Sequence, residues 1–162
     1  MKQADYSDTP QLPYKIGCGG LVLRKKNNTY EVLCLYRGKE KFGMRGDSYH
    51  LPKGTLKLSE TLEQCALRET REETGALCQS VCYIGATTSK LSSKDLRYDI
   101  SYTRHFFLMR LISMHEAHDD EHDEVVWLPV EEAYQKLAEI PKEEDKIVKR
   151  AVALVESRII QL

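Results

Sequence analysis

The sequence lacks any long hydrophobic run and any excess of one sign of charge. No apolar stretch among the 162 residues is long enough to cross a bilayer, and the polar amino terminus does not have the charged-then-apolar build of a signal peptide. Lys and Arg total 24 against 25 Asp and Glu, which argues against a dedicated nucleic-acid coat and against a polybasic membrane anchor. We therefore expect a cytoplasmic protein with no membrane partner and no dedicated nucleic-acid partner.

Cysteine shows no regular pattern either. The thiols are Cys18, Cys34, Cys65, Cys78 and Cys82, an odd number without zinc-ribbon spacing. Cys34 and Cys65 stand in apolar patterns, which predicts small buried hydrophobic side chains. Cys78 and Cys82 could pair under oxidation, although reduced thiols fit a cytosolic protein better.

The composition that remains is that of one ordinary domain. A hydrophobic fraction of 41% and a charged fraction of 30% are usual for a globular protein. A chain of this length can bury roughly 70% of its unfolded surface around a single core. Residues 1–13 are polar and aperiodic, so we expect a loose lead-in followed by one domain at 14–162. No repeat, linker or low-complexity tract indicates a second domain.

Hydrophobic periodicity predicts alternating strands and helices. The expected strands lie at 15–25, 30–37, 80–88, 100–111 and 125–128, the first two as a hairpin. The expected helices lie at 61–75, from 129 onward and at 143–161, with loops at 38–48, 89–98 and 114–123. Thr61 and Gln64 predict a capping box for the first helix, and Gly75 predicts its end. Strands on either side of one glutamate-bearing helix, followed by a terminal helix, predict an α/β sandwich with a mixed sheet.

The stretch 54–76 carries the strongest chemical signal in the chain. Glu69, Glu72 and Glu73 fall within little more than one helical turn, so Glu69 stands beside both of the others. Carboxylates this close repel one another unless a cation lies between them. Mg²⁺ or Mn²⁺ is the natural partner, because hard cations prefer oxygen ligands. The alternative is a solvated acidic face, which is what most charge runs are.

A basic segment precedes the acidic helix. Its cations outnumber Glu40 and Asp47, and they are Arg37, Lys39, Lys41, Arg45, Lys53 and Lys57. Phosphate oxygens placed between a metal and this segment would be held from both sides. We expect Arg37, Arg45 and Lys53 to bind substrate, and the other lysines to be solvated loop residues.

Histidines and acids alternate in the loop 114–123. His115, His118 and His122 have gaps of three and four residues, which on a helix could form a transition-metal site. The flanking acids and the absence of an apolar face favour a loop instead.

The spacing within 54–76 resembles the Nudix box, the signature of hydrolases that cut a diphosphate linked to another moiety. The matching order is Gly54, five residues, Glu60, seven residues, Arg68-Glu69, Glu72-Glu73 and Gly75. Thr70 and Ala76 depart from it, since they occupy positions that are bulky and aliphatic in the family. The resemblance covers nearly all of residues 17–137. It implies a Nudix-type α/β/α sandwich with a mixed β-sheet.

The resemblance also implies a mechanism and a role for each matching residue. An activated water attacks phosphorus while Mg²⁺ neutralises the phosphate oxygens. Gly54, Glu60, Arg68 and Gly75 map to structural positions of the box, although Glu60 and Arg68 could also form a plain surface ion pair. Glu69 or Glu121 would be the general base, and Glu73 also belongs to the catalytic set. The implied metal ligands are Glu69, Glu72, Glu73, Glu121 and the Lys53 backbone carbonyl.

Within the family, the chain is most similar to asymmetrical diadenosine-tetraphosphate hydrolases. The similar segments are 18–22, 51–54, 66–70 and Glu121-His122 shortly before Trp127-Leu128. Tyr98 is the best match to a substrate-binding tyrosine of those enzymes, but it lies several residues further along, and loop packing explains it equally well. Val125 replaces a second aromatic residue, and Tyr49 stands where many relatives have tryptophan.

The predicted function is hydrolysis of a phosphoanhydride bond in a nucleoside polyphosphate, with a dinucleoside polyphosphate such as diadenosine tetraphosphate as the favoured substrate. The same box also serves enzymes that act on nucleoside triphosphates, RNA 5′ ends, ADP-ribose or inositol pyrophosphates. A non-catalytic nucleotide-binding module is a third alternative, although such modules typically lose box glutamates that this chain retains. A monomer and a homodimer are both compatible with the sequence.

Overall fold

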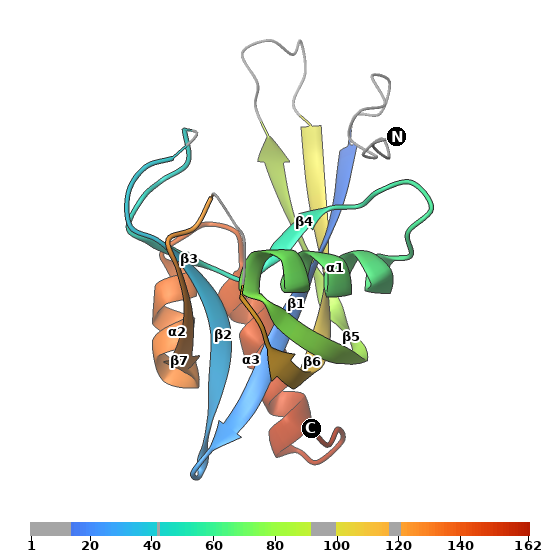
Figure 1. Cartoon of the computed structure of the whole chain (residues 1–162), viewed down its shortest axis with the longest axis vertical. Coiled ribbons are helices and arrows are strands. Elements are labelled where there is room, and N and C mark those ends of the chain that lie inside the picture. The colour runs from blue at the N-terminus through green and yellow to red at the C-terminus, as the bar shows by residue number, and fades with distance from the viewer. Residues whose placement is uncertain (1–13, 42, 92–99, 117–120) are drawn as a thin grey trace.

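A computed structural model describes residues 14–41, 43–91, 100–116 and 121–162 (Figure 1). Its strands are β1 (Tyr14–Lys26), β2 (Thr29–Arg37), β3 (Ser48–His50), β4 (Lys53–Thr55), β5 (Ala76–Leu91), β6 (Ile100–Met114) and β7 (Glu124–Pro129). Its helices are α1 (Leu62–Thr74), α2 (Val130–Ala138) and α3 (Glu144–Glu156).

The strands form one mixed sheet. Its main order is β3-β2-β1-β6-β5, while β4 pairs with β1 and β7 pairs with β2. β1 and β6 run parallel, and the other pairs are antiparallel. The predicted hairpin is confirmed, because Leu23 pairs with Val32 and the turn between the strands holds Asn27 at φ 55°.

Helices cover both faces of this sheet, as Figure 1 shows. Alternate side chains of β1 point to opposite faces. Val22 and Cys18 belong to the cluster under α1, whereas Leu21 and Leu23 belong to the larger cluster under α2 and α3. The predicted α/β/α sandwich with a mixed sheet is therefore confirmed. The terminal helix contributes the apolar stripe Ile147, Val148, Ala151, Val152 and Val155 to the larger cluster.

Several predicted boundaries are wrong. β5 begins at Ala76 rather than at residue 80, because Gly75 reverses the chain and pairing with β6 starts at once, Ala76 opposite Met114. The same pairing carries β5 to Leu91, into the expected loop. α3 ends at Glu156 instead of residue 161, and Arg158 beyond it has φ 59°. The short strands β3 and β4 were not predicted.

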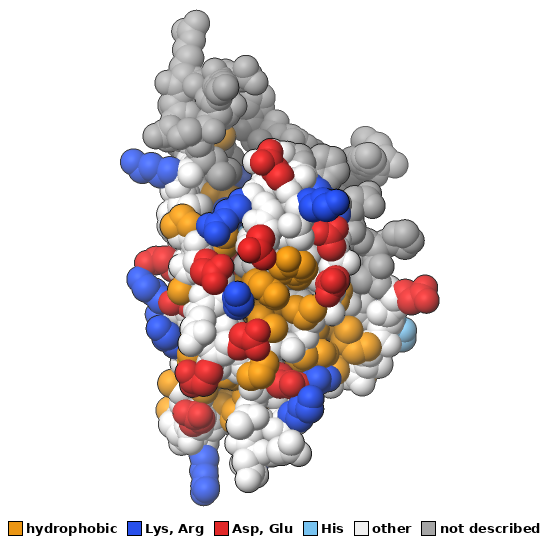
Figure 2. Space-filling view, turned by 90° about the vertical axis from the view of Figure 1, so that its left-hand side faces the viewer, with side chains coloured by type: hydrophobic (Ala, Val, Ile, Leu, Met, Phe, Trp, Pro, Cys, Tyr) orange, Lys and Arg blue, Asp and Glu red, His pale blue; other side chains and the backbone are white. Residues whose placement is uncertain are grey.

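Three further features concern the cysteines, the helices and the charges on one side of the molecule. All five cysteines are free thiols, and Cys34 and Cys65 are buried as predicted. None of the described helices has the length and apolar character needed to cross a membrane. The side of the molecule that carries α2 and β7 shows acidic and basic side chains interspersed around hydrophobic ones (Figure 2), in keeping with a net charge of −1.

Candidate active site

Helix α1 is fixed at both ends by its own sequence. The Thr61 side chain accepts from the Gln64 N–H, and the Gln64 side chain accepts from the Thr61 N–H, so the predicted capping box is confirmed. Gly75 ends the helix at φ 74°, a left-handed conformation that glycine adopts without strain. Thr70, at a position that is aliphatic in the Nudix box, is fully buried. The caps and this buried face set which way the glutamates point.

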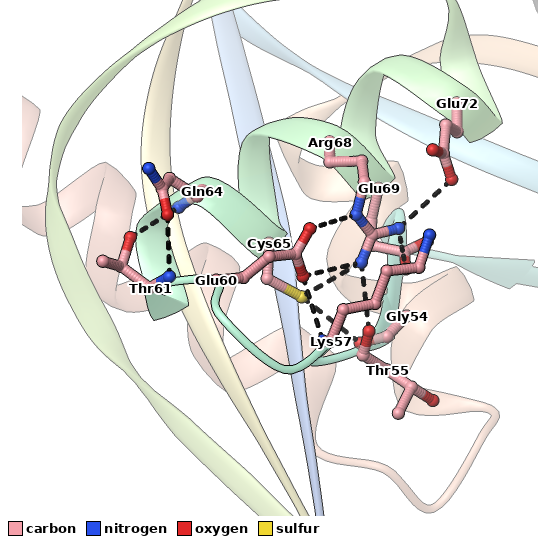
Figure 3. Close-up of polar contacts among 10 residues, drawn as sticks. All are labelled: Gly54, Thr55, Lys57, Glu60, Thr61, Gln64, Cys65, Arg68, Glu69 and Glu72. Atoms are coloured by element: carbon pink, nitrogen blue, oxygen red, sulfur yellow. Dashed lines mark hydrogen bonds and ion pairs between the residues drawn. The ribbon is translucent and has the colours of Figure 1, made fainter. Parts of the chain in front are cut away.

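Arg68 ties the helix to the segment that precedes it (Figure 3). Its Nε and Nη2 donate to the two oxygens of Glu60 at 2.5 and 3.0 Å, and Nη2 also donates to the Thr55 carbonyl at 3.1 Å. The hydrogen bond from Arg68 holds the pKa of Glu60 below its ordinary value. With side-chain exposures of 20% and 14%, this two-point pair is more sheltered than a surface ion pair. These contacts join α1 to the segment that precedes it.

Arg68 also holds two of the box glutamates. Nη1 donates to Glu69 Oε1 at 2.6 Å and to Glu72 Oε2 at 3.2 Å. Burial raises the pKa of Glu69, and the hydrogen bond from Arg68 opposes that shift. A Cβ at Gly54 would lie 2.1 Å from the Glu69 carboxyl carbon, so only glycine leaves room for this carboxylate. Glu72 is more exposed, at 55% of its side chain.

Glu73, also on α1, lies close to residues from a distant loop. The Lys53 N–H donates to Glu73 Oε2 at 2.8 Å, which places the Lys53 backbone beside this carboxylate. Ligand atoms of Glu73, Glu121 and His122 all lie within 4.8 Å of one another. Two carboxylates and an imidazole at this separation could hold a divalent metal ion. His122 was not among the predicted ligands of this site, although it directly follows Glu121 in the sequence.

Arg37 contacts two members of that cluster. It is buried, at 4% exposure, and its guanidinium donates to the Glu121 carbonyl at 3.0 Å and to His122 Nε2 at 3.3 Å. It also contacts His50 Nε2 at 3.3 Å. Burial and the nearby positive charges lower the pKa of His50 to about 2, so the ring is neutral and accepts this bond. Arg37 therefore positions the loop that carries Glu121.

One cavity of about 560 Å³ connects these groups. Eight of the predicted site residues line it, namely Arg37, Lys53, Gly54, Arg68, Glu69, Glu72, Glu73 and Glu121. Arg45 is exposed and donates to the Glu139 carbonyl at 3.3 Å, outside the cavity lining. Tyr98 lies outside the described residues.

The Lys53 side chain turns away from Glu73. Its ammonium forms an ion pair with Glu144 of α3 at 2.6 Å, and the other Glu144 oxygen accepts from the Leu51 N–H at 2.8 Å. Residues that the sequence did not single out also line the cavity, and they are Lys15, Tyr102, Arg104 and Lys142. Tyr102 and Arg104 alternate along one face of a predicted strand, which was the available signal for them; Lys142 had none.

A larger cavity of about 750 Å³ lies beyond the C-terminal end of α1. It shares Arg68 and Glu72 with the first cavity, and its other lining residues include Leu67, Leu77 and Cys78. Glu73, Glu121 and His122 do not line it. We therefore take the smaller cavity, with the acidic cluster, as the candidate active site.

Comparison with known sequences supports the resemblance to the Nudix box. The NUDIX domain family model matches residues 13–151. A candidate mutator protein of Mycobacterium tuberculosis, MutT4, is 35% identical over 91 residues, and Nudix hydrolase 6 of Arabidopsis thaliana is 32% identical over 122 residues. These matches take in 56% and 74% of the chain, but only 36% and 40% of the two relatives.

Solved structures share the fold at low identity. A NUDIX hydrolase from Nitrosomonas europaea has a TM-score of 0.69 at 17% identity, over 86% of this chain and 89% of that one. A binary complex of a C. elegans Ap4A hydrolase has a TM-score of 0.67 at 19% identity, over 88% of this chain and 98% of that one. At such identities the likeness concerns the fold alone.

Proposed function

The chain belongs to the NUDIX domain family, and we propose that it is a metal-dependent pyrophosphohydrolase that cleaves a phosphoanhydride bond in a nucleoside polyphosphate. The observation that carries this proposal is the convergence of box glutamates from α1 with Glu121 and His122 in one cavity. A solvated acidic face, the alternative reading of the glutamates, would not need a partner carboxylate from a loop far along the chain.

The donor set fits Mg²⁺ or Mn²⁺. Glu69, Glu72, Glu73, Glu121 and the Lys53 carbonyl would hold the metal, and all five residues line the cavity. When bound, Mg²⁺ neutralises phosphate oxygens and lowers the pKa of a coordinated water.

The protein's own groups supply the positioning. Arg68 orients Glu69 and Glu72, the Lys53 N–H orients Glu73, and Arg37 holds the backbone at Glu121. Glu69 and Glu121 are both candidates for the group that accepts the proton from the attacking water. A base must lie within about 3 Å of that water, so separate Gln variants of the two residues would identify it by the larger loss of turnover number.

The favoured substrate is a dinucleoside polyphosphate such as diadenosine tetraphosphate. The segments 18–22, 51–54 and 66–70, which are similar to those of asymmetrical diadenosine-tetraphosphate hydrolases, support this choice. The competing substrates are nucleoside triphosphates, RNA 5′ ends, ADP-ribose and inositol pyrophosphates. The competing class is a nucleotide-binding module without turnover.

A substrate panel with Mg²⁺ tests the proposal. We expect the wild-type protein to release products fastest from dinucleoside polyphosphates. Glu73→Gln should lower kcat/KM by about 100-fold or more with unchanged thermal unfolding, because it removes a metal-binding carboxylate. Glu63→Gln, an exposed position in the first turn of the same helix, is the matched control and should keep full activity. Absence of turnover on every pyrophosphate by folded wild-type protein would contradict the enzymatic function.

A further inference from the structure

The end of the cleft around Glu144 carries cations that the proposed chemistry does not use. Arg104 of β6 lines this end at 3% exposure, and its Nη1 donates to Ser89 at 2.7 Å. Its Nε is buried without a hydrogen-bond partner among the described residues. A buried guanidinium nitrogen left without an acceptor is costly, unless a ligand completes it.

Arg104 is packed against an aromatic ring in this position. Its guanidinium lies 3.8 Å from the centre of the Tyr102 ring, and the Lys15 ammonium lies 5.0 Å from the same ring. Tyr102 is itself buried, at 8% exposure. A stacked, preorganised guanidinium loses little conformational freedom when it binds an anion.

Lys142 lies two residues before the start of α3 and lines the same cavity. In the part of the chain that the structure describes, its ammonium forms no hydrogen bond or ion pair. Burial, together with the nearby charge of Lys53, lowers the pKa of Lys142 to about 8. The ammonium is therefore partly desolvated and repelled by other cations, the setting in which a bound anion stabilises it most.

The charges at this end do not balance. Lys53, Arg104 and Lys142 meet a single buried carboxylate, Glu144, which pairs with Lys53 at 2.6 Å. Arg104 and Lys142 are thus left without a carboxylate partner in the part of the chain that the structure describes, and the neutral His50 ring adds no charge. The part of the same cavity that holds Glu73 and Glu121 is acidic and suited to a metal ion. A substrate that spans both ends must be anionic at its far end as well as at the bond that is cut.

Lys53 contacts both the acidic part of the cavity, at Glu73, and the cationic part, at Glu144. Its N–H donates to Glu73, whereas its ammonium pairs with Glu144. The ends of the cavity are therefore separated by about the length of one lysine side chain, a span that a short run of linked phosphates can cover.

We propose that Arg104 and Lys142 form a subsite for a further phosphate group, one beyond the two phosphates that flank the bond that is cleaved. This inference rests on the proposed function and narrows its substrate class to molecules with an extended phosphate chain. Lys142 is then a specificity-determining residue. Substrates with two phosphates, such as ADP-ribose, do not reach it and gain nothing from it.

Binding of inorganic tripolyphosphate to metal-free protein in EDTA, measured by calorimetry, tests the subsite without turnover. We expect the wild-type protein to bind, and Lys142→Met to weaken binding about tenfold or more, because a charge-assisted contact is lost while the apolar stem remains. Lys25→Met, which removes one charge at an exposed position of β1, is the matched control and should bind like wild type. Failure of wild type to bind, or equal losses in the two variants, would overturn the subsite.

Kinetics separate this inference from the proposed function. With Mg²⁺, Lys142→Met should raise KM for diadenosine tetra- and pentaphosphate about tenfold, while KM for ADP-ribose stays unchanged. An equal effect on all substrates would refute the specificity role. If no pyrophosphate is hydrolysed and Lys142→Met still weakens tripolyphosphate binding, the proposed function fails and the subsite stands. If hydrolysis is robust and Lys142→Met changes neither measurement, the subsite alone fails.

Discussion

The substitution Gly54→Ala tests whether activity depends on the position of the Glu69 carboxylate, because it moves this group without removing it. Gly54 lies in β4, and a Cβ there would stand 2.1 Å from the Glu69 carboxyl carbon and 2.2 and 2.3 Å from its oxygens. Ordinary contact begins at 3.4 Å, so the carboxyl group must retreat by about 1.3 Å. The obstructing atoms are the far end of a flexible side chain rather than backbone. The fold should therefore persist while the carboxylate moves.

The expected loss of activity follows from that displacement. A misplacement of about 1 Å at a reacting centre can cost roughly 100-fold in rate, or about 2.7 kcal/mol of transition-state stabilisation. Stability should fall by only about 1–3 kcal/mol, because the hydrogen bond from Arg68 to Glu69, 2.6 Å long, is weakened. The measurements are kcat/KM with saturating Mg²⁺ and thermal unfolding of the same preparation.

Gly38→Ala provides the control. A Cβ there would lie 3.2 Å from an Asp123 oxygen and 3.3 Å from the Tyr36 ring, so small adjustments accommodate it. This variant should retain activity within about twofold, since the neighbouring side chains need to move by only a few tenths of an ångström. Wild-type activity in folded Gly54→Ala would refute the idea that Glu69 must occupy its present position. Loss of folding in both variants would refute the assignment of the effect to Glu69.

Three further outcomes are expected. Because the pKa of Glu60 is depressed by Arg68, the pair stabilises the fold above the ordinary value of 4.5 and loses that contribution as pH falls through the lower folded pKa. Urea unfolding should thus show Glu60→Gln less stable than wild type by about 1–3 kcal/mol at pH 7, with the difference shrinking below pH 4.5; a constant difference would contradict the pairing. Arg37→Lys keeps the charge but not the forked contacts to the Glu121 carbonyl and His122, so Mg²⁺ titrations of activity should show a 10- to 100-fold weaker response, about the cost of losing a support of a metal ligand. Removal of divalent metal with EDTA should abolish turnover, and Mg²⁺ or Mn²⁺ should restore it; turnover that persists in EDTA would exclude metal-dependent hydrolysis.

The box helix could be predicted from sequence because its determinants are local. Thr61, Gln64 and Gly75 specify the ends of α1 through contacts a few residues long. The layers could be predicted for a similar reason, since strand alternation reports which face each side chain occupies. The start of β5 could not, because it depends on pairing with Met114, which lies far along the chain.

The cationic residues of the cleft were harder to predict from the sequence. Arg37 was predicted to bind substrate as part of a basic segment; the fold buries it, with its guanidinium on the Glu121 carbonyl, at the lining of the cavity. A charge count along the chain cannot distinguish a buried positioning cation from an exposed binding one. Arg104 and Lys142 come from β6 and from the approach to α3, and only tertiary structure brings them to one cavity.

The three residues of β4 connect all of these parts, although the strand is too short to leave a periodic signal. The Lys53 N–H holds Glu73, Gly54 leaves the space that the Glu69 carboxylate occupies, and the Thr55 carbonyl accepts from Arg68. The Lys53 side chain then reaches Glu144 at the start of α3. Pairing of β4 with β1 fixes this segment to the centre of the sheet. A shift of β4 would consequently move the acidic and the cationic ends of the cleft together, so the register of this short strand sets the geometry of both.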